Sequence, residues 1–226
     1  MYDRTLRTYP IGNKIRGTTL YYNNFTGIKD WSSCRSCILC NGRRRVCIRR
    51  DGIRTWPNST RCIKLLFIGE APGATEDATG IPFSGRSGRI LNQIFEYTQA
   101  SFEFCITNLV CCRPKDVEMI MPQGIDSEEQ LSQLTPEYIY SNFNRQPRSE
   151  EIIACQLHIE EIITSFKPQG IVYLGQVARN SHMTNRKSLS LVHPSFISKQ
   201  EYKVIPMRKE AKKLYDFIKD IKGKYT

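Results

Sequence analysis

The sequence predicts an α/β protein, a three-layer α/β/α sandwich around a central, mainly parallel sheet of four or five strands. Short apolar runs at residues 63–68 and 170–175 are bounded by glycine, which is typical of buried strands. Longer segments with helical spacing separate these runs. Alternation of strands with helices favours a parallel sheet covered on both faces.

The elements follow in chain order. We expect strands at residues 63–68, 102–110 and 170–175, a fourth that approaches His193, and a further one at 202–206. Helical spacing predicts helices at residues 89–95, 149–166 and 207–222, and a short one after 175. Residues 34–62 lack strong periodicity and are expected to form a ligand-bearing loop. Ligands of such sheets bind beyond the carboxyl ends of the strands, so the loops after Gly69, Asn108 and His193 should meet there.

Composition limits the class of protein. A length of 226 residues suits a single domain over residues 1–226. The net charge of +11 favours a polyanionic partner, although a solvated basic surface would give the same value. No apolar run approaches the roughly 20 residues that span a bilayer, and residues 1–30 lack the apolar stretch of a secretion signal. We therefore expect a cytoplasmic protein that does not associate with membranes.

Nine cysteines in such a chain do not favour a disulfide framework, because a reducing compartment keeps thiols reduced. Core packing, a reactive thiol and thiolate ligands of a metal are the alternatives. Together with the positive charge, the cysteines favour a nucleic-acid protein with a metal site.

Three loops carry residues with chemical potential. The first is GEAPGATED at residues 69–77, with its continuation GIPFSGRSG at 80–88, in which glycines allow close approach to a ligand and Glu70, Glu76 and Asp77 offer carboxylates. The second ends a strand at Asn108, whose carboxamide can both donate and accept toward a base edge. The third contains His193. Each alone is also explained as a turn, a cap or a structural histidine.

The order and spacing of these segments resemble the family 4 uracil-DNA glycosylases, the iron–sulfur branch of that superfamily. The resemblance rests on GEAPGATED, GIPFSGRSG, ITNLVCCRP, NRQPRSEEIIAC, IVYLG and HPS, in that order, and covers most of residues 34–196. It implies a monofunctional DNA glycosylase that flips out a pyrimidine, most readily uracil, and hydrolyses its N-glycosidic bond to leave an abasic site. It also implies a role in base-excision repair as a monomer on single- or double-stranded DNA.

The resemblance sorts the cysteines. It implies a 4Fe-4S cluster held by four thiolates, Cys34, Cys37, Cys112 and Cys155. Spacing alone allows a zinc site equally, so the choice of iron comes from the family. Cys40 and Cys111 lie close enough in sequence to compete for the same assignment.

The resemblance also implies roles for the loop residues. Phe83 would stack under the flipped base, Asn108 would bind its Watson–Crick edge, and His193 would lie near the uracil O2. Ala71 stands where the best-known branch has a water-activating Asp, which leaves Glu70, or Glu76 or Asp77, to orient water. Glu76 would line the C5 edge. Ser195, with Ser84 and Ser87, would bind phosphates, and Phe196 or Ile197 would fill the space that the base vacates.

Two departures from the family affect the expected substrate. The chain has an insertion at residues 115–143, within which residues 127–143 are expected to be helical, and the segment from Leu174 to His193 is shorter than in the family. We also expect an N-terminal extension at residues 1–33. The insertion is either a surface decoration or part of a reshaped pocket. The alternatives are therefore a glycosylase of the same fold that excises a modified pyrimidine in defence against phage, and a non-catalytic iron–sulfur or zinc DNA-binding module.

Overall fold

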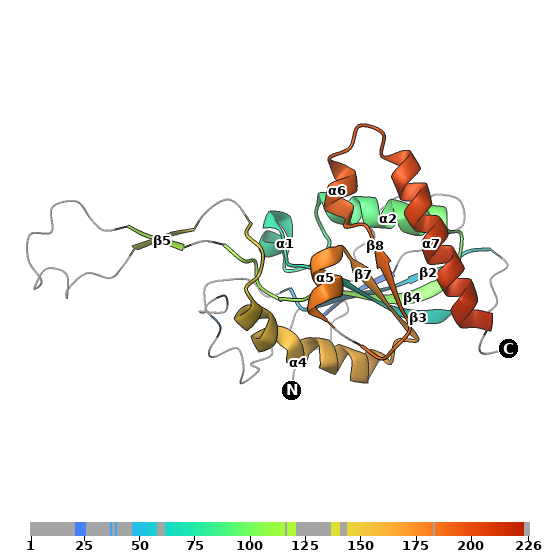
Figure 1. The fold of residues 1–226 in the computed structure, drawn as a ribbon, viewed down its shortest axis with the longest axis horizontal. Helices are drawn as coiled ribbons and strands as arrows, with labels where there is room; N and C mark the ends of the chain where they lie inside the picture. The colour runs from blue at the N-terminus through green and yellow to red at the C-terminus, as the bar shows by residue number, and fades with distance from the viewer. Residues whose placement is uncertain are drawn as a thin grey trace, which may run out of the picture.

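The computed structural model describes residues 21–25, 37, 39, 47–57, 62–115, 117–120, 137–140, 144–182 and 184–223, and gives the backbone alone for 21–25, 117–120 and 137–140. Within these residues a six-stranded sheet has the order β1-β2-β4-β3-β7-β8 (Figure 1). The strands are β1 (Tyr21–Phe25), β2 (Arg49–Arg54), β3 (Ile63–Gly69), β4 (Phe102–Asn108), β7 (Gly170–Leu174) and β8 (Ser188–Leu191). Strands β4, β3, β7 and β8 are parallel to one another, and β2 is antiparallel to both of its neighbours.

Helices cover both faces of the sheet, which confirms the predicted sandwich. One face packs against α2 (Arg86–Thr98) and α7 (Val204–Gly223), with α6 (Pro194–Ser198) beside them. The other packs against α4 (Ser149–Phe166) and α5 (Gln176–Ser181). Strand β3 shows why its sequence is apolar throughout: Leu65 and Phe67 enter the first core, and Leu66 and Ile68 enter the second.

Strand β2 lies inside the segment that was expected to be a loop, so that prediction was wrong for residues 49–54. Its buried positions alternate as in any half-buried strand, but they carry Arg50, Gly52 and Arg54. Because these residues are not apolar, hydrophobic periodicity could not reveal the strand. The Gly-rich loop likewise contains a helix that was not expected, α1 (Ala74–Thr79), which ends at Gly80 with a φ of 73°.

The predicted strand at residues 202–206 was also wrong, because α7 begins at Val204. Pro206 occupies the first turn, where a missing N–H costs nothing. Buried Met207, Ala211 and Leu214 then follow at helical spacing.

The insertion leaves the sandwich as two antiparallel strands, β5 (Val117–Ile120) and β6 (Glu137–Tyr140). The helix expected at 127–143 is contradicted at residues 137–140, where β-favouring Tyr and Ile follow a proline. The rest of that expected helix lies outside the described residues. At the base of the insertion, Arg145 N donates to Pro114 O at 3.3 Å.

None of the helices within the described ranges is long and apolar enough to span a membrane.

Candidate functional site

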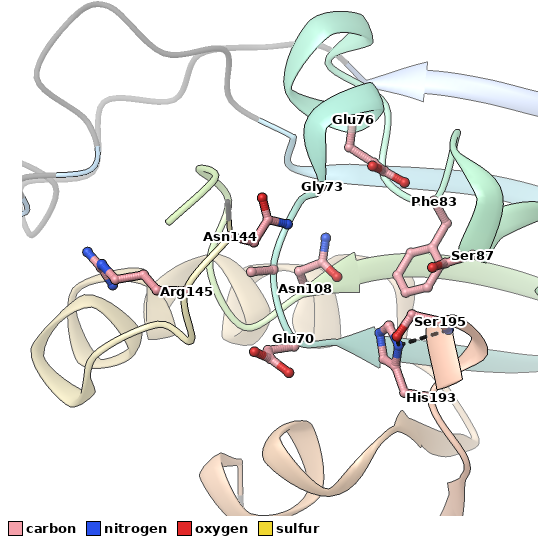
Figure 2. Close-up of a pocket in the computed structure, with 11 residues that line it drawn as sticks. Glu70, Gly73, Glu76, Phe83, Ser87, Asn108, Asn144, Arg145, His193 and Ser195 are labelled. Carbon is pink, nitrogen blue, oxygen red and sulfur yellow. Dashed lines mark hydrogen bonds between the residues drawn. The ribbon is translucent and has the colours of Figure 1, made fainter. Parts of the chain in front are cut away.

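The ends of parallel strands bring the predicted loops together. Gly69, the last residue of β3, lies opposite Asn108, the last residue of β4, and Leu109 N donates to Gly69 O at 2.9 Å. Beyond β8, the loop with His193 reaches the same edge of the sheet (Figure 2). A cavity of about 290 Å³ opens between these loops. It is lined by Glu70, Ala71, Gly73, Glu76, Phe83, Ser87, Asn108, Asn144, Arg145, His193 and Ser195.

Asn108 places an unused acceptor in this cavity. The residue is 1% exposed, and its Oδ1 has no hydrogen-bond partner among the described residues. Leaving a buried acceptor unpaired costs about 1–3 kcal/mol, which a ligand N–H would recover. A Cβ at Gly69 would lie 2.4 Å from this Oδ1 and 2.6 Å from Cζ of Phe83, so the absence of a side chain at position 69 makes room for both groups.

Phe83 forms an apolar wall of the cavity. Its backbone has a φ of 54°, a left-handed conformation that costs a non-glycine residue roughly 1–2 kcal/mol. Arg50 donates to its carbonyl oxygen at 2.8 Å, and a Cβ on Gly88 would lie 1.7 Å from that oxygen. The surrounding structure therefore holds the ring in place, with its centroid 6.2 Å from that of His193.

His193 is held in one tautomer at the start of α6. Ser195 N donates to its Nδ1 at 3.1 Å, and Ser195 Oγ lies 2.6 Å from the same nitrogen. Burial lowers the pKa of His193 to about 4. The ring is therefore neutral near pH 7, and because Nδ1 accepts the backbone N–H, its proton is on Nε2.

The expected carboxylates separate into two groups. Glu70 lines the cavity, and burial raises its pKa above the usual value. Glu76 also lines it and accepts from Gly85 N at 3.1 Å through Oε1. Asp77 is not among the lining residues; its carboxylate lies 3.2 Å from Lys115 Nζ and 3.9 Å from a guanidinium nitrogen of Arg113.

Sequence reasoning did not assign two of the lining residues, Asn144 and Arg145, to the site. Arg113 Nε donates to Asn144 Oδ1 at 2.5 Å, which fixes the carboxamide beside Gly73 (Figure 2). Arg145 donates to both carboxylate oxygens of Glu151, at 2.8 and 2.5 Å. The NRQP segment that begins at Asn144 was the available signal, since it follows the insertion directly.

A second cluster of chemically active side chains lies behind this cavity. Cys37, Cys111, Cys112 and Cys155 are all buried in one packed group with apolar neighbours. A hydrogen bond from the Cys111 side chain lowers the pKa of Cys155, against the opposing effect of burial. Of the four predicted ligands, Cys37, Cys112 and Cys155 thus share one cluster, and Cys34 lies outside the described residues. Grouped buried thiols of this kind suit a soft metal centre.

His158 connects the two clusters and was missed by sequence reasoning. Its Nε2 lies 2.8 Å from Asn108 O, and its Nδ1 contacts Cys155 O. One ring nitrogen and the sulfurs of Cys111 and Cys155 lie within 4.8 Å of one another. Burial lowers the pKa of His158 to about 4, so its ring is neutral near pH 7.

Comparison with known proteins decides the family. The family model described as the uracil DNA glycosylase superfamily matches residues 59–222. The chain belongs to this superfamily. The residues matched to the uracil DNA glycosylase superfamily include the three loops after β3, β4 and β8 that line the cavity.

Curated relatives agree with the assignment. The chain is 34% identical over 115 residues to the Type-4 uracil-DNA glycosylase of Saccharolobus solfataricus, covering 50% of this chain and 41% of that protein. It is 30% identical over 146 residues to the Type-4 uracil-DNA glycosylase of Sulfurisphaera tokodaii, and this match covers 64% of this chain and 50% of that protein. For the Thermotoga maritima protein the identity is 28% over 155 residues, covering 68% and 62%. The chain of this superfamily member thus spans about half the length of the curated relatives it matches.

Proposed function

We propose that this chain is a monofunctional DNA glycosylase that flips a pyrimidine, most readily uracil, out of DNA and hydrolyses its N-glycosidic bond. The observation that carries the proposal is the buried Oδ1 of Asn108, which has no hydrogen-bond partner in the described part of the chain and lines a cavity with Phe83 and His193. The names of its relatives as Type-4 uracil-DNA glycosylases support uracil as the base. The product would be an abasic site in a base-excision repair pathway.

Asn108 and Phe83 select the base. Uracil presents an N3–H donor beside the O4 acceptor, and a carboxamide pairs with both through its Oδ1 and Nδ2 atoms. The Phe83 ring supplies a face on which a planar base can stack. Extrusion from the helix costs a few kcal/mol, so these contacts must repay the lost stacking.

His193 stabilises the departing base. Breaking the N-glycosidic bond moves negative charge onto the pyrimidine, including its O2. A neutral imidazole with its proton on Nε2 donates a hydrogen bond to that oxygen, and the bond strengthens as charge develops. This donor stabilises the transition state more than the bound substrate.

Glu70 is the best-placed carboxylate to orient the attacking water. It lines the cavity beside Ala71, the position that lacks a carboxylate, whereas Asp77 is engaged by Lys115 and Arg113. Its raised pKa brings it closer to that of an effective general base. Glu76 is held toward Gly85 and would line the C5 edge of the base.

DNA would lie across the rim of this cavity. The net charge of +11 favours phosphate binding, and the lining residues Ser87 and Ser195 carry hydroxyl groups that would bind individual phosphates. Phe196 is 61% exposed and Ile197 is fully buried, so Phe196 is the residue that would fill the vacated base position. The protein would act as a monomer, and it would act in the cytoplasm, where a reducing environment keeps its cysteines as thiols.

Cys34, Cys37, Cys112 and Cys155 would hold a 4Fe-4S cluster, with Cys111 as the rival for Cys112. Buried thiols from separate segments fit such a group better than they fit a core of ordinary side chains. The cluster would supply iron–thiolate bonds that tie the first cysteine segment to α4 beside the pocket. The chemistry on the base needs no electron transfer, and zinc is the alternative metal.

A modified pyrimidine is the second candidate substrate. Asn144 lines the cavity and directly follows the insertion, so this departure from the family ends next to the pocket wall. Its carboxamide and the Glu76 carboxylate make that wall polar, which would suit a polar substituent on the base. Excision of such a base would fit defence against phage with modified DNA.

The test is incubation with oligonucleotides that contain uracil or modified cytosines, followed by alkali to cleave abasic sites. Release of uracil by the wild type, reduced about 100-fold or more in Asn108→Ala and His193→Ala, supports the proposal. Base release from the modified DNA and not from the uracil-containing DNA would instead support the second candidate, excision of a modified pyrimidine. DNA binding without release from any substrate would favour a non-catalytic DNA-binding module.

A further inference from the structure

Helix α4 carries His158 one turn after Cys155, directly beneath the loop with Asn108. The imidazole is fully buried. Its Nε2 lies 2.8 Å from Asn108 O and 3.2 Å from Thr107 Oγ1, and its Nδ1 contacts Cys155 O. Thr107 Oγ1 itself donates to Ile48 O at 2.6 Å. The ring therefore contacts the end of β4 and the cysteine-bearing turn of α4 at the same time.

The direction of the central hydrogen bond follows from chemistry. Both ring nitrogens face carbonyl oxygens, which only accept, and the neutral ring has one proton for them. We place that proton on Nε2, because Nε2 faces two acceptors, Asn108 O and the Thr107 Oγ1 that already donates to Ile48 O, whereas Nδ1 faces Cys155 O alone. The Oδ1 of the Asn108 side chain makes no hydrogen bond within the described residues. Its orientation in the cavity must therefore come from its backbone and from the packing around it.

Two bonds fix that backbone. On one side Leu109 N donates to Gly69 O at 2.9 Å, which continues the parallel ladder past the end of β4. On the other side the ladder has ended, and His158 supplies the bond to Asn108 O. Without it, that peptide keeps the bond to Gly69 O and a longer contact of 3.5 Å between Thr107 Oγ1 and Asn108 O, and it loses the shortest bond to its carbonyl oxygen.

We propose that His158 is a positioning residue that sets the Asn108 carboxamide for the base edge through its bond to Asn108 O. This role rests on the proposed function, in which Asn108 binds the base. His158 does not line the cavity, so it acts through Asn108 and not on the substrate. It also connects the base-binding loop to the turn of α4 that carries Cys155.

The sharpest test compares His158→Gln with His158→Asn. Gln can place an amide N–H near the position of Nε2, whereas Asn is one methylene shorter and cannot reach it. We expect His158→Asn to lower kcat for uracil release about 10- to 100-fold with little change in KM, because a small misplacement of a binding group has effects of this size. His158→Gln should recover most of the loss. His158→Phe, which keeps the ring volume, replaces the Asn variant if that protein does not fold.

His182 provides the matched control. It is also buried, with its Nδ1 2.8 Å from the Tyr173 hydroxyl, and it is absent from the cavity lining. His182→Gln and His182→Asn should leave kcat within about twofold of each other if the effect at position 158 is specific. Metal content is measured on every protein, since His158 lies beside the thiols.

Hydrogen exchange separates this proposal from the proposed function. Amides of residues 107–112 should exchange faster in His158→Asn than in His158→Gln, whether or not the wild type releases uracil. No base release from the wild type would refute the proposed function alone. Equal kcat and equal exchange in the two variants would overturn the positioning role, and so would metal loss that accounts for the whole effect.

Discussion

Ser195 donates its backbone N–H to Nδ1 of His193 at 3.1 Å, and this bond determines which ring nitrogen keeps the proton. Protonation of Nδ1 would remove the acceptor and break the bond. The pKa of about 4 that burial gives His193 therefore protects the geometry as well as the charge state.

The first prediction concerns pH. Because the folded-state pKa of His193 is about 4, its contribution to uracil release should stay constant from about pH 8 to about pH 5 and fall near pH 4. The lowered pKa of His193 also affects stability. Above about pH 6.5 the ring is neutral in both the folded and the unfolded chain, so it adds no pH dependence to the free energy of unfolding. Between about pH 6.5 and about pH 4 only the unfolded chain takes up the proton, so the free energy of unfolding falls as the pH falls. Single-turnover release of uracil is measured in a Glu70→Gln background, because this substitution removes the Glu70 carboxyl group, whose titration would otherwise overlap with that of His193. A midpoint near 6.5 in that variant would contradict the assignment.

The second prediction concerns Gly69. In Gly69→Ala the new methyl would lie 2.4 Å from Asn108 Oδ1 and 2.6 Å from the Phe83 ring, so both groups must move. We expect uracil release to fall at least about 100-fold, because a displacement of this kind in a binding site has effects of that size. Gly223→Ala is the control, since nothing lies within 4 Å of a Cβ there. Unchanged release by Gly69→Ala would show that the pocket tolerates the shift.

The third prediction separates the adjacent cysteines. Cys155→Ser and Cys112→Ser should lose iron measured by elemental analysis, whereas Cys111→Ser should keep it, because the family resemblance assigns the ligand role to Cys112. Proteins are purified without oxygen, and thermal unfolding is measured in parallel. Iron loss in Cys111→Ser with retention in Cys112→Ser would exchange the two roles. Zinc alone in the wild type would rule out the iron–sulfur cluster.

The fourth prediction concerns the exposed Phe196. A residue that fills the vacated base position matters when the base must be extruded from a duplex. Phe196→Ala should lower kcat/KM on double-stranded DNA about 10-fold or more, with a smaller effect on single-stranded DNA and no change in thermal stability. Ile153→Ala is the control, since Ile153 is 67% exposed and lies on α4, which covers the other face of the sheet. Equal losses on both kinds of DNA would argue against the wedge.

The parts of the fold that sequence predicted are those whose burial is apolar. Strands β3, β4 and β7 were placed correctly because both of their faces enter hydrophobic cores. Strand β2 was missed because its buried positions carry Arg50, Gly52 and Arg54, and Arg50 is buried for its bond to the Phe83 carbonyl. A polar side chain buried for a tertiary bond leaves no periodic signal.

The residues of the candidate site likewise fall into those that local sequence motifs predicted and those that only the structure revealed. The residues in glycine-rich and strand-end motifs, such as Phe83 and Asn108, could be proposed from their local pattern. The role of Asn144 depends on a hydrogen bond to Arg113, and that of His158 on the packing of α4 against β4. Both are contacts between segments that are distant in the chain. A single sequence does not show which distant segments meet, so these roles became visible only in the structure.

The backbone bond between Arg145 and Pro114 has a consequence for how this protein can change. Because these two residues are hydrogen-bonded, the insertion at residues 115–143 begins and ends at the same place on the sandwich. Lengthening a loop of that kind costs little conformational entropy, because the cost of closure grows only with the logarithm of its length. We therefore expect that segments inserted or deleted between Pro114 and Arg145 leave the packing of the three layers unchanged. This junction is accordingly the place to vary the chain in directed evolution of base preference.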